Sequence, residues 1–270
     1  MTVLEDIIAA TRQQVRECRS SANLRELERQ AELHVPREFR VALKSASRTG
    51  RTAIIAELKK ASPSRGLIRS DFDPAKLARE LERAGAAALS VLTDKEFFQG
   101  SLDNLRIASA TTQIPCLCKD FIVDEFQILE ARANCADAVL LIVAALSGAE
   151  LKLLLGRARE LHLDVLCEVH DEAELQTALD AGCNLIGVNS RDLRSFRVDL
   201  DTAFRLAPCI PAGVFAVAES GIETDVDITK LRAAGYGAFL IGETLMKAPV
   251  PGEALKELLR SAAIQVPTSA

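Results

Sequence analysis

The feature that most constrains the fold is a regular alternation of short apolar runs with amphipathic stretches from about residue 53 onward. Eight runs rich in aliphatic and β-branched residues predict strands, at 53–58, 87–92, 115–119, 137–143, 164–169, 184–189, 214–219 and 238–242. The stretches between them have helical spacing; several open on Asp or Glu, and two close on Gly. Strand, helix and strand in this order predict right-handed βαβ units in a parallel sheet.

Eight such units predict a closed α/β architecture, the (β/α)₈ TIM barrel. The competing architecture is an open doubly wound sheet, but the dinucleotide fingerprint Gly-x-Gly-x-x-Gly is absent after the first predicted strand. Helical patterns at 2–18 and 23–33 precede that strand, and no Gly/Ser-rich linker follows them. We therefore expect a single barrel domain over residues 1–270, in which 1–50 form an N-terminal helical capping extension.

Composition excludes several function classes. A net charge of −5 and a pI near 5.4 argue against nucleic-acid binding, which relies on a broadly basic surface. A small anionic ligand needs only a local cluster of cations, so it stays compatible with this charge. No run approaches the roughly 20 apolar residues of a membrane helix, and we expect no membrane partner. We expect the chain to act as a monomer.

Cysteine usage points to a reducing compartment. The chain has 7 cysteines, an odd number that cannot all pair internally, and they form no pair of Cys-x-x-Cys units typical of zinc sites. We read them as reduced, mostly buried thiols in a cytoplasmic protein, and no metal site is indicated. His34 and His162 fall in helical patterns with no carboxylate-rich sequence around them.

Polar side chains stand at the carboxyl ends of five predicted strands, where barrel enzymes build their sites. They are Glu57, Lys59, Lys119, Glu168, Asn189, Arg191, Glu219 and Ser220. Any one of them alone is most simply a solvated loop residue. Their joint occurrence favours a site, because charges over a dry barrel persist only by mutual pairing, and such pairing also tunes the pKa values of acids and bases.

The alternation of side chains along a strand assigns these residues to faces. Lys119 shares a face with Leu117, so Cys116 and Cys118 face the opposite way, toward the helices. Cys167 points outward by the same rule and is interpreted as a core residue rather than a nucleophile. His170 is interpreted as a loop histidine beyond the barrel rim.

The last two strand ends have a different character. The segments AESGI at 218–222 and LIGETLM at 240–246 place glycine beside a small or hydroxyl residue, or at a helix start, where backbone N–H groups can point at an anion. The loops after strands 7 and 8 form the recurring phosphate site of barrels. An ordinary turn glycine would explain either one alone, but two in succession at these strands favour a phosphate site.

Several stretches together resemble one known family. They are IIAELKKASPSRG, LSVLTDKEFFQGSLDNL, PCLCKDFIVDEFQI, CEVHDEAEL, IGVNSRDL, VAESGI and FLIGETLM, which span residues 54–246. In this order they resemble the indole-3-glycerol phosphate synthase family of tryptophan biosynthesis. The resemblance implies a carboxy-lyase that converts 1-(2-carboxyphenylamino)-1-deoxyribulose 5-phosphate, a phosphorylated small molecule, into indole-3-glycerol phosphate, carbon dioxide and water. It also implies that no cofactor is needed.

The resemblance also implies roles for individual residues. Lys119 matches the general acid of ring closure, Glu168 the base of dehydration, and Lys59 a second cation that binds substrate. The remaining matches are orienting polar residues (Glu57, Asn189, Glu219), positions near the substrate carboxylate (Ser62, Arg191), phosphate-binding turns (Ser220, Gly221, Gly242, Glu243) and aromatic walls (Phe98, Phe121). Ser190 and Thr244 stand where many members have Asn and Ser.

Two other functions are compatible with a phosphate-binding barrel. A phosphoribosylanthranilate isomerase would share the phosphate loops but would call for a Cys and Asp pair, and it gives no reason for Lys59 and Lys119 together. A non-catalytic phosphate-binding barrel would keep the same loops and tolerate loss of Lys119 or Glu168. Both residues are present in this chain.

Overall fold

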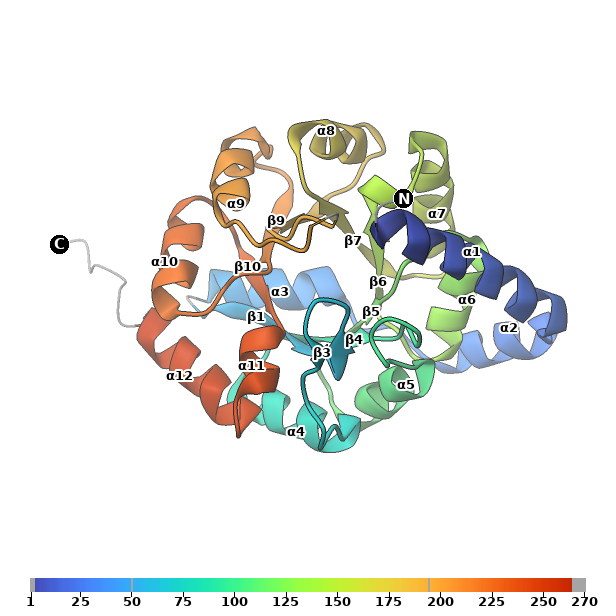
Figure 1. The fold of residues 1–270 in the computed structure, drawn as a ribbon, viewed down its shortest axis with the longest axis horizontal. Coiled ribbons are helices and arrows are strands. Elements are labelled where there is room, and N and C mark those ends of the chain that lie inside the picture. Colours follow the sequence, from blue (N-terminus) through green and yellow to red (C-terminus); the bar gives the residue numbers. More distant parts are fainter. Residues whose placement is uncertain (1–2, 50, 194, 264–270) are drawn as a thin grey trace.

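A computed structural model of the chain describes residues 3–49, 51–193 and 195–263. Eight parallel strands form a closed barrel in which the first strand pairs with the last, as Figure 1 shows. They are β1 (Ala53–Leu58), β4 (Ala88–Leu92), β5 (Cys116–Lys119), β6 (Ala138–Ile142), β7 (Asp164–Val169), β8 (Leu185–Asn189), β9 (Phe215–Glu219) and β10 (Ala238–Ile241). The (β/α)₈ prediction is confirmed, with strand bounds that differ from the predicted ones by one residue at several ends.

Helices surround the barrel. They are α4 (Pro74–Ala84), α5 (Leu102–Thr111), α6 (Glu125–Ala133), α7 (Gly148–Glu160), α8 (Glu172–Asp180), α9 (Asp201–Leu206), α10 (Asp225–Ala233), α11 (Glu243–Lys247) and α12 (Pro251–Ala263). Most begin at a side-chain cap: Asp73 accepts from the Lys76 N–H before α4, and Ser147 and Glu150 form a capping box at α7. Helix α4 ends at Gly85, whose φ of 105° glycine adopts without strain.

The alternation of side chains along the strands divides the barrel into two apolar layers. The outer layer, between strands and helices, contains Cys116, Cys118 and Cys167, as predicted. The inner layer contains Leu117, Leu166 and their neighbours on the other strands. Because the inner layer is filled with aliphatic side chains, polar groups that share its face emerge at the carboxyl ends of the strands.

The residues before β1 form three helices, α1 (Val3–Ser21), α2 (Leu24–Leu33) and α3 (Phe39–Arg48). The sequence patterns predicted the first two and missed α3. Phe39 and Leu43 of α3 are fully buried against inner-layer residues at the amino end of the barrel. Ile7 of α1 joins the same layer at the opposite end, beside Phe121 and Leu140. In Figure 1, α1 lies on the near side and α3 on the far side of the barrel.

A buried carboxylate ties this N-terminal segment to the barrel. Asp137, whose side chain is fully buried, accepts hydrogen bonds from His34 Nε2 at 2.9 Å, Arg37 N at 2.7 Å and Cys116 N at 2.7 Å. Arg37 Nε also donates to it at 2.9 Å. His34 was expected within a helix but follows the end of α2, and the carboxylate that it binds is distant in sequence.

His162 was expected in a helix but lies in the turn after α7, with a φ of 57°. All 7 cysteines are unpaired, and four of them, Cys116, Cys118, Cys167 and Cys183, are buried. Within residues 3–49, 51–193 and 195–263, no helix combines the length and the apolar character needed to cross a bilayer.

Candidate active site

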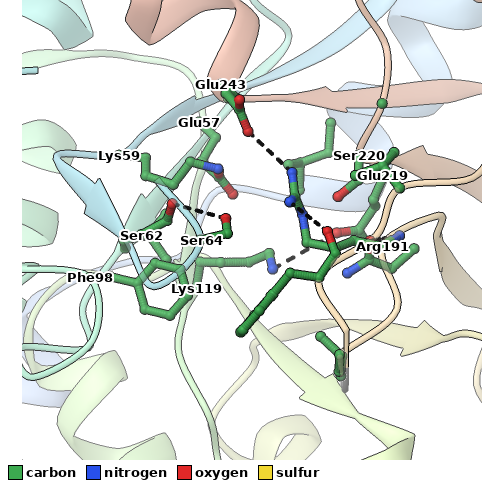
Figure 2. Close-up of a pocket in the computed structure, with 18 of the residues that line it drawn as sticks. Glu57, Lys59, Ser62, Ser64, Phe98, Lys119, Arg191, Glu219, Ser220 and Glu243 are labelled. Carbon is green, nitrogen blue, oxygen red and sulfur yellow. Dashed lines mark hydrogen bonds and ion pairs between the residues drawn. The ribbon is translucent and has the colours of Figure 1, made fainter. Parts of the chain in front are cut away.

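A cavity of about 540 Å³ opens at the carboxyl ends of the strands. All fourteen site residues predicted from the sequence line it: Glu57, Lys59, Ser62, Phe98, Lys119, Phe121, Glu168, Asn189, Arg191, Glu219, Ser220, Gly221, Gly242 and Glu243. Figure 2 shows Lys59, Ser62, Phe98 and Lys119 on one side of the cavity and Arg191, Glu219 and Ser220 on the other. Residues from distant parts of the sequence thus surround one space.

At the floor of this cavity a lysine stands between two glutamates. Lys119 Nζ donates to Glu168 Oε2 at 3.2 Å and lies 3.9 Å from Glu219 Oε2. The Glu168 and Glu219 side chains are almost completely buried. Strand β5 therefore presents a proton donor, and β7 presents a carboxylate within hydrogen-bond reach of it.

A second ion pair lies beside the first. Lys59 Nζ is 2.6 Å from Glu57 Oε1, and both residues extend from the end of β1. Glycines on neighbouring strands make room for the buried carboxylates. A Cβ at Gly242 would collide with the Glu57 carboxyl group, and a Cβ at Gly187 would collide with that of Glu219. Gly242 thus shapes the acid-base centre as well as the start of α11.

The buried charges give the carboxyl groups different protonation states. Burial would raise the pKa of Glu168, but the charge of Lys119 and the neighbouring His170 and Asn189 side chains hold it well below its usual range. Burial and the negative charge of Glu168 raise the pKa of Glu219 to about 8. Near neutral pH the site therefore holds an ionised Glu168 and a protonated Glu219.

The two lysines compensate the remaining charge. Burial would raise the pKa of Glu57, but the positive charges of Lys59 and Lys119 lower it. Burial would lower the pKa of Lys119, but the negative charges of Glu168 and Glu57 raise it above its usual range. Lys119 is therefore an ammonium near neutral pH, and an ammonium can donate a proton.

The loops after β9 and β10 form the far end of the cavity. Ser220 and Gly221 have φ values of 67° and 77°, so this turn uses the left-handed region. A Cβ at Gly221 would lie 2.6 Å from Val198 Cγ1, which leaves room for glycine alone. Thr244 Oγ1 donates to the Ile222 carbonyl at 2.8 Å and joins the two loops.

Glu243, predicted as part of a phosphate-binding turn, is surrounded by cations. Its carboxylate lies 3.0 Å from Arg65 Nε, 3.2 Å from an Arg191 terminal nitrogen and 2.5 Å from Lys247 Nζ. Arg65 belongs to the hairpin of β2 (Ala61–Ser62) and β3 (Gly66–Leu67), so Glu243 joins three loops of the rim. Sequence reasoning missed Arg65 and Lys247, although Arg65 lies within the segment KKASPSRG and Lys247 directly follows GETLM.

Apolar side chains complete the wall. The rings of Phe98 and Phe121 lie 6.1 Å apart, in a tilted arrangement that can flank an aromatic ligand. Leu4 and Ile7 of α1 also line the cavity. The N-terminal segment thus contributes to the wall of the site, which its pattern of helical periodicity could not reveal.

His170 follows β7 as expected but does not lie beyond the barrel rim. Its side chain turns back toward the strand end and is only 14% exposed. Its Nε2 lies 3.4 Å from Glu168 Oε1, and its Nδ1 lies 3.0 Å from Glu174 Oε2. The spacing Glu-x-His at the strand end was the available signal, since residues two apart share a face.

The comparisons with known proteins identify the family. A family model described as indole-3-glycerol phosphate synthase matches residues 4–258. A protein of that name from Koribacter versatilis (strain Ellin345) is 55% identical over 96% of this chain and 99% of its own length. The chain belongs to the indole-3-glycerol phosphate synthase family. A family protein from Polaromonas naphthalenivorans (strain CJ2) is 47% identical over 95% of this chain and 98% of its own.

Membership of the indole-3-glycerol phosphate synthase family makes the chain an enzyme of tryptophan biosynthesis and a carboxy-lyase, as the resemblance implied. A more distant solved structure, 3-hexulose-6-phosphate synthase from Salmonella typhimurium, has a TM-score of 0.63 at 12% identity. It covers 80% of this chain and 100% of its own and supports the barrel fold alone. In the part of the chain that the structure describes, no group of three His, Cys, Asp or Glu side chains could hold a metal ion.

Proposed function

We propose that this cavity closes the ring of 1-(2-carboxyphenylamino)-1-deoxyribulose 5-phosphate with Lys119 as general acid and Glu168 as general base. The observation that carries the proposal is the pairing of Lys119 with Glu168 at 3.2 Å in the buried mouth of the barrel. An ammonium and a carboxylate at one place can give one proton and take another during a single turnover.

Ring closure uses the ammonium. The aniline nitrogen of the substrate pushes electrons into its ring, and the ring carbon that bears the carboxylate attacks the ketone. Lys119 donates a proton to the developing alkoxide, and the surrounding carboxylates have kept that proton in place. The carbon–carboxylate bond then breaks, carbon dioxide leaves, and its electron pair returns to the ring system. The substrate supplies the electrons for each of these bond changes.

Dehydration uses the carboxylate. Glu168 takes the proton from the carbon adjacent to the new hydroxyl group, and the hydroxyl leaves as water after a cation protonates it. Lys59, 2.6 Å from Glu57, is the second cation of the site and is assigned to substrate binding and to this proton. Glu57, Asn189 and Glu219 orient the two lysines and Glu168.

The rest of the cavity provides binding groups. Phe98 and Phe121 flank the anthranilate ring, and Ser62 and Arg191 face its carboxylate. The opposite end receives the phosphate at the turns that contain Ser220, Gly221, Gly242 and Glu243. Arg65 and Lys247 bring positive charge to that end, and Glu243 balances it while no phosphate is bound.

The isomerase alternative has weaker support. It would need a cysteine and an aspartate as its acid-base pair, but Cys116, Cys118 and Cys167 belong to the layer between strands and helices. A non-catalytic barrel would have no use for a buried ionised glutamate beside a lysine, since burying such a pair costs desolvation free energy.

We also propose that the chain acts as a cytoplasmic monomer and as one domain, with residues 1–50 as a cap. Seven unpaired cysteines support a reducing compartment. The site residues all come from one chain, which supports a site that is complete in the monomer. Light scattering on the purified protein tests the oligomeric state.

One assay tests the reaction. Purified protein mixed with the carboxyphenylamino substrate is expected to produce indole absorbance together with one equivalent of carbon dioxide. An isomerase would give neither signal with this substrate, and a non-catalytic barrel would bind it unchanged.

A further inference from the structure

Glu168 makes two ionic contacts, one with each carboxylate oxygen. Oε2 faces Lys119 at 3.2 Å, and Oε1 faces His170 Nε2 at 3.4 Å. Asn189 also favours the ionised form of the carboxyl group. The carboxylate therefore has the Lys119 ammonium beside one oxygen and the His170 imidazole beside the other.

The imidazole is itself held from its other side. Glu174 Oε2 accepts from the His170 backbone N–H at 2.8 Å and lies 3.0 Å from His170 Nδ1. Glu174 occupies the third position of α8, and its own N–H is bound by Asp171 at 2.9 Å. The start of α8 therefore holds Glu174 in place, and Glu174 holds the ring.

The charge of the ring follows from its two neighbours. Each ring nitrogen faces a carboxylate oxygen, and an ionised carboxylate can only accept a hydrogen bond. The contact with Glu174 puts a proton on Nδ1, and the negative charge of Glu168, 3.4 Å from Nε2, favours a second proton there, which makes the ring an imidazolium. Burial lowers the pKa of His170, but its contacts with Glu168 and Glu174 and their negative charges raise it to about 10.

The reaction gives this cation a use. While Lys119 is an ammonium, it stabilises the Glu168 carboxylate on its own. Once Lys119 has given its proton to the alkoxide, it is neutral and no longer does so. Glu168 must still be ionised at that moment, because dehydration follows ring closure. The other groups that face Glu168 are Asn189 of β8, Glu219 of β9, and Glu57 at the end of β1. Lys59, which follows β1, is already paired with Glu57.

We propose that His170 is a positioning residue for Glu168: its imidazolium holds Oε1 and keeps the carboxylate ionised and aimed at the substrate after Lys119 has released its proton. The inference rests on the proposed role of Glu168 as the dehydration base. It assigns to His170 an effect on dehydration and none on ring closure.

Two substitutions separate this role from a purely structural one. The amide of asparagine reaches the place of Nδ1, so His170→Asn keeps the contact with Glu174 and loses the one with Glu168. The amide of glutamine reaches the place of Nε2, so His170→Gln keeps a neutral donor to Glu168. His162→Asn is the matched control, because His162 is exposed and its left-handed backbone suits asparagine.

Single-turnover experiments follow carbon dioxide and indole separately. For His170→Asn we expect carbon dioxide release within about threefold of the parent and indole formation slowed by about tenfold. This is less than the roughly 100-fold lower limit for loss of the base itself, because Glu168 is still present. The pH below which the dehydration rate falls should rise by about 1–3 units in this variant. The reason is that an opposite charge near a carboxylate lowers its pKa by that much, and the variant has lost the charge beside Glu168. His170→Gln should lie between the parent and His170→Asn.

Proton NMR provides a readout independent of turnover. The chain has 3 histidines, so the His170 ring signal is assigned by its loss in His170→Asn. We expect it to stay in the imidazolium form from pH 6 to 9 in the parent and to titrate at lower pH in Glu174→Gln. Titration near the ordinary value of about 6.5 in the parent would overturn the proposal.

The kinetic outcomes are equally decisive. Two results would overturn the inference: equal slowing of carbon dioxide release and indole formation in His170→Asn, or slower indole formation in His170→Gln than in His170→Asn. Either would mean that His170 only stabilises the start of α8. If His170→Asn does not fold, Glu174→Gln carries the same test. If Glu168→Gln itself dehydrates at the parent rate, the proposed function fails; if it stalls while His170→Asn does not, the inference about His170 fails alone.

Discussion

Lys119 Nζ and Glu168 Oε2 lie 3.2 Å apart, although their strands, β5 and β7, are not neighbours in the barrel. The two side chains meet across the mouth because the strand between them, β6, ends on apolar residues and leaves that space open. A proton donor and a proton acceptor are thereby held in one place by two separate strands, so each can be removed without displacing the backbone of the other.

This separation makes the two proton-transfer roles testable. Lys119→Ala and Glu168→Gln should each lower kcat by roughly 100- to 10,000-fold, the usual contribution of a general acid or base. Lys119→Ala should stop ring closure and release no carbon dioxide. Glu168→Gln should release it and stall before dehydration. Trapping labelled carbon dioxide in a single turnover distinguishes them, and equal release by both variants would contradict the assignment.

The phosphate end of the cavity gives a binding prediction. Ser220 has a φ of 67°, a conformation that aspartate tolerates, so Ser220→Asp should fold normally. Its added negative charge should repel the phosphate and raise KM by about tenfold, which corresponds to about 1.4 kcal/mol. Inorganic phosphate should compete with substrate in the parent enzyme and lose that effect in the variant. An unchanged KM would show that this turn does not bind the phosphate.

The hairpin of β2 and β3 is expected to act as a lid over Lys59. Gly66 has a φ of 65° and open space around it, so Gly66→Ala adds backbone strain of about 1–2 kcal/mol without a clash. We expect kcat and KM to change together, as they do when a closing loop is altered. Replacing Pro63 is also expected to change kcat and KM together. Gly213→Ala, also in open space, is the control, and equal behaviour of the two alanine variants would argue against a lid.

Glu219 predicts a pH dependence of stability. Its pKa is about 4.5 in the unfolded chain and about 8 in the folded one, so the folded state holds a proton that the unfolded state releases. The stabilisation of the fold by this proton is fully present below pH 4.5 and is lost as the pH rises to about 8. The Glu219→Gln variant lacks this pH-dependent stabilisation. The melting temperature of the variant minus that of the parent should therefore increase between pH 5 and 8, and a constant difference would show that Glu219 is already ionised.

Asp137 predicts the cost of releasing the N-terminal segment. Asp137→Asn removes a buried charge that His34 and Arg37 bind, which should destabilise the fold by about 3–5 kcal/mol, the range for a broken buried pair. Asp103→Asn, which breaks an exposed pair with Arg106, should cost less than about 1 kcal/mol. Urea denaturation measures both. Equal costs would mean that Asp137 does not anchor the segment.

Sequence reasoning succeeded where a residue's place follows from local periodicity. The alternation along each strand was enough to direct Lys119 and Glu168 inward and Cys116, Cys118 and Cys167 outward. Sequence reasoning failed where a contact joins distant parts of the chain. The α3 segment was missed because its partners, inner-layer residues at the amino end of the barrel, come later in the sequence. His34 and Asp137 form their pair across such a distance.

The errors at the site have the same origin. The family resemblance implied Glu243, but its cations Arg65 and Lys247 become recognisable only when three loops come together. The sequence predicts His170 as a loop histidine beyond the barrel rim. Its direction depends on Glu174, whose position is fixed by the start of α8.

The pairing of β1 with β10 has a consequence for biosynthesis of the chain. The β1 strand leaves the ribosome early but finds one of its two hydrogen-bonding neighbours only when the last strand has been made. Until then the growing sheet has open edges and an unfilled interior, the kind of surface that promotes association between chains. We therefore expect the nascent enzyme to depend on chaperones until translation nears its end, and C-terminal truncations that remove β10 to aggregate rather than accumulate as partial barrels.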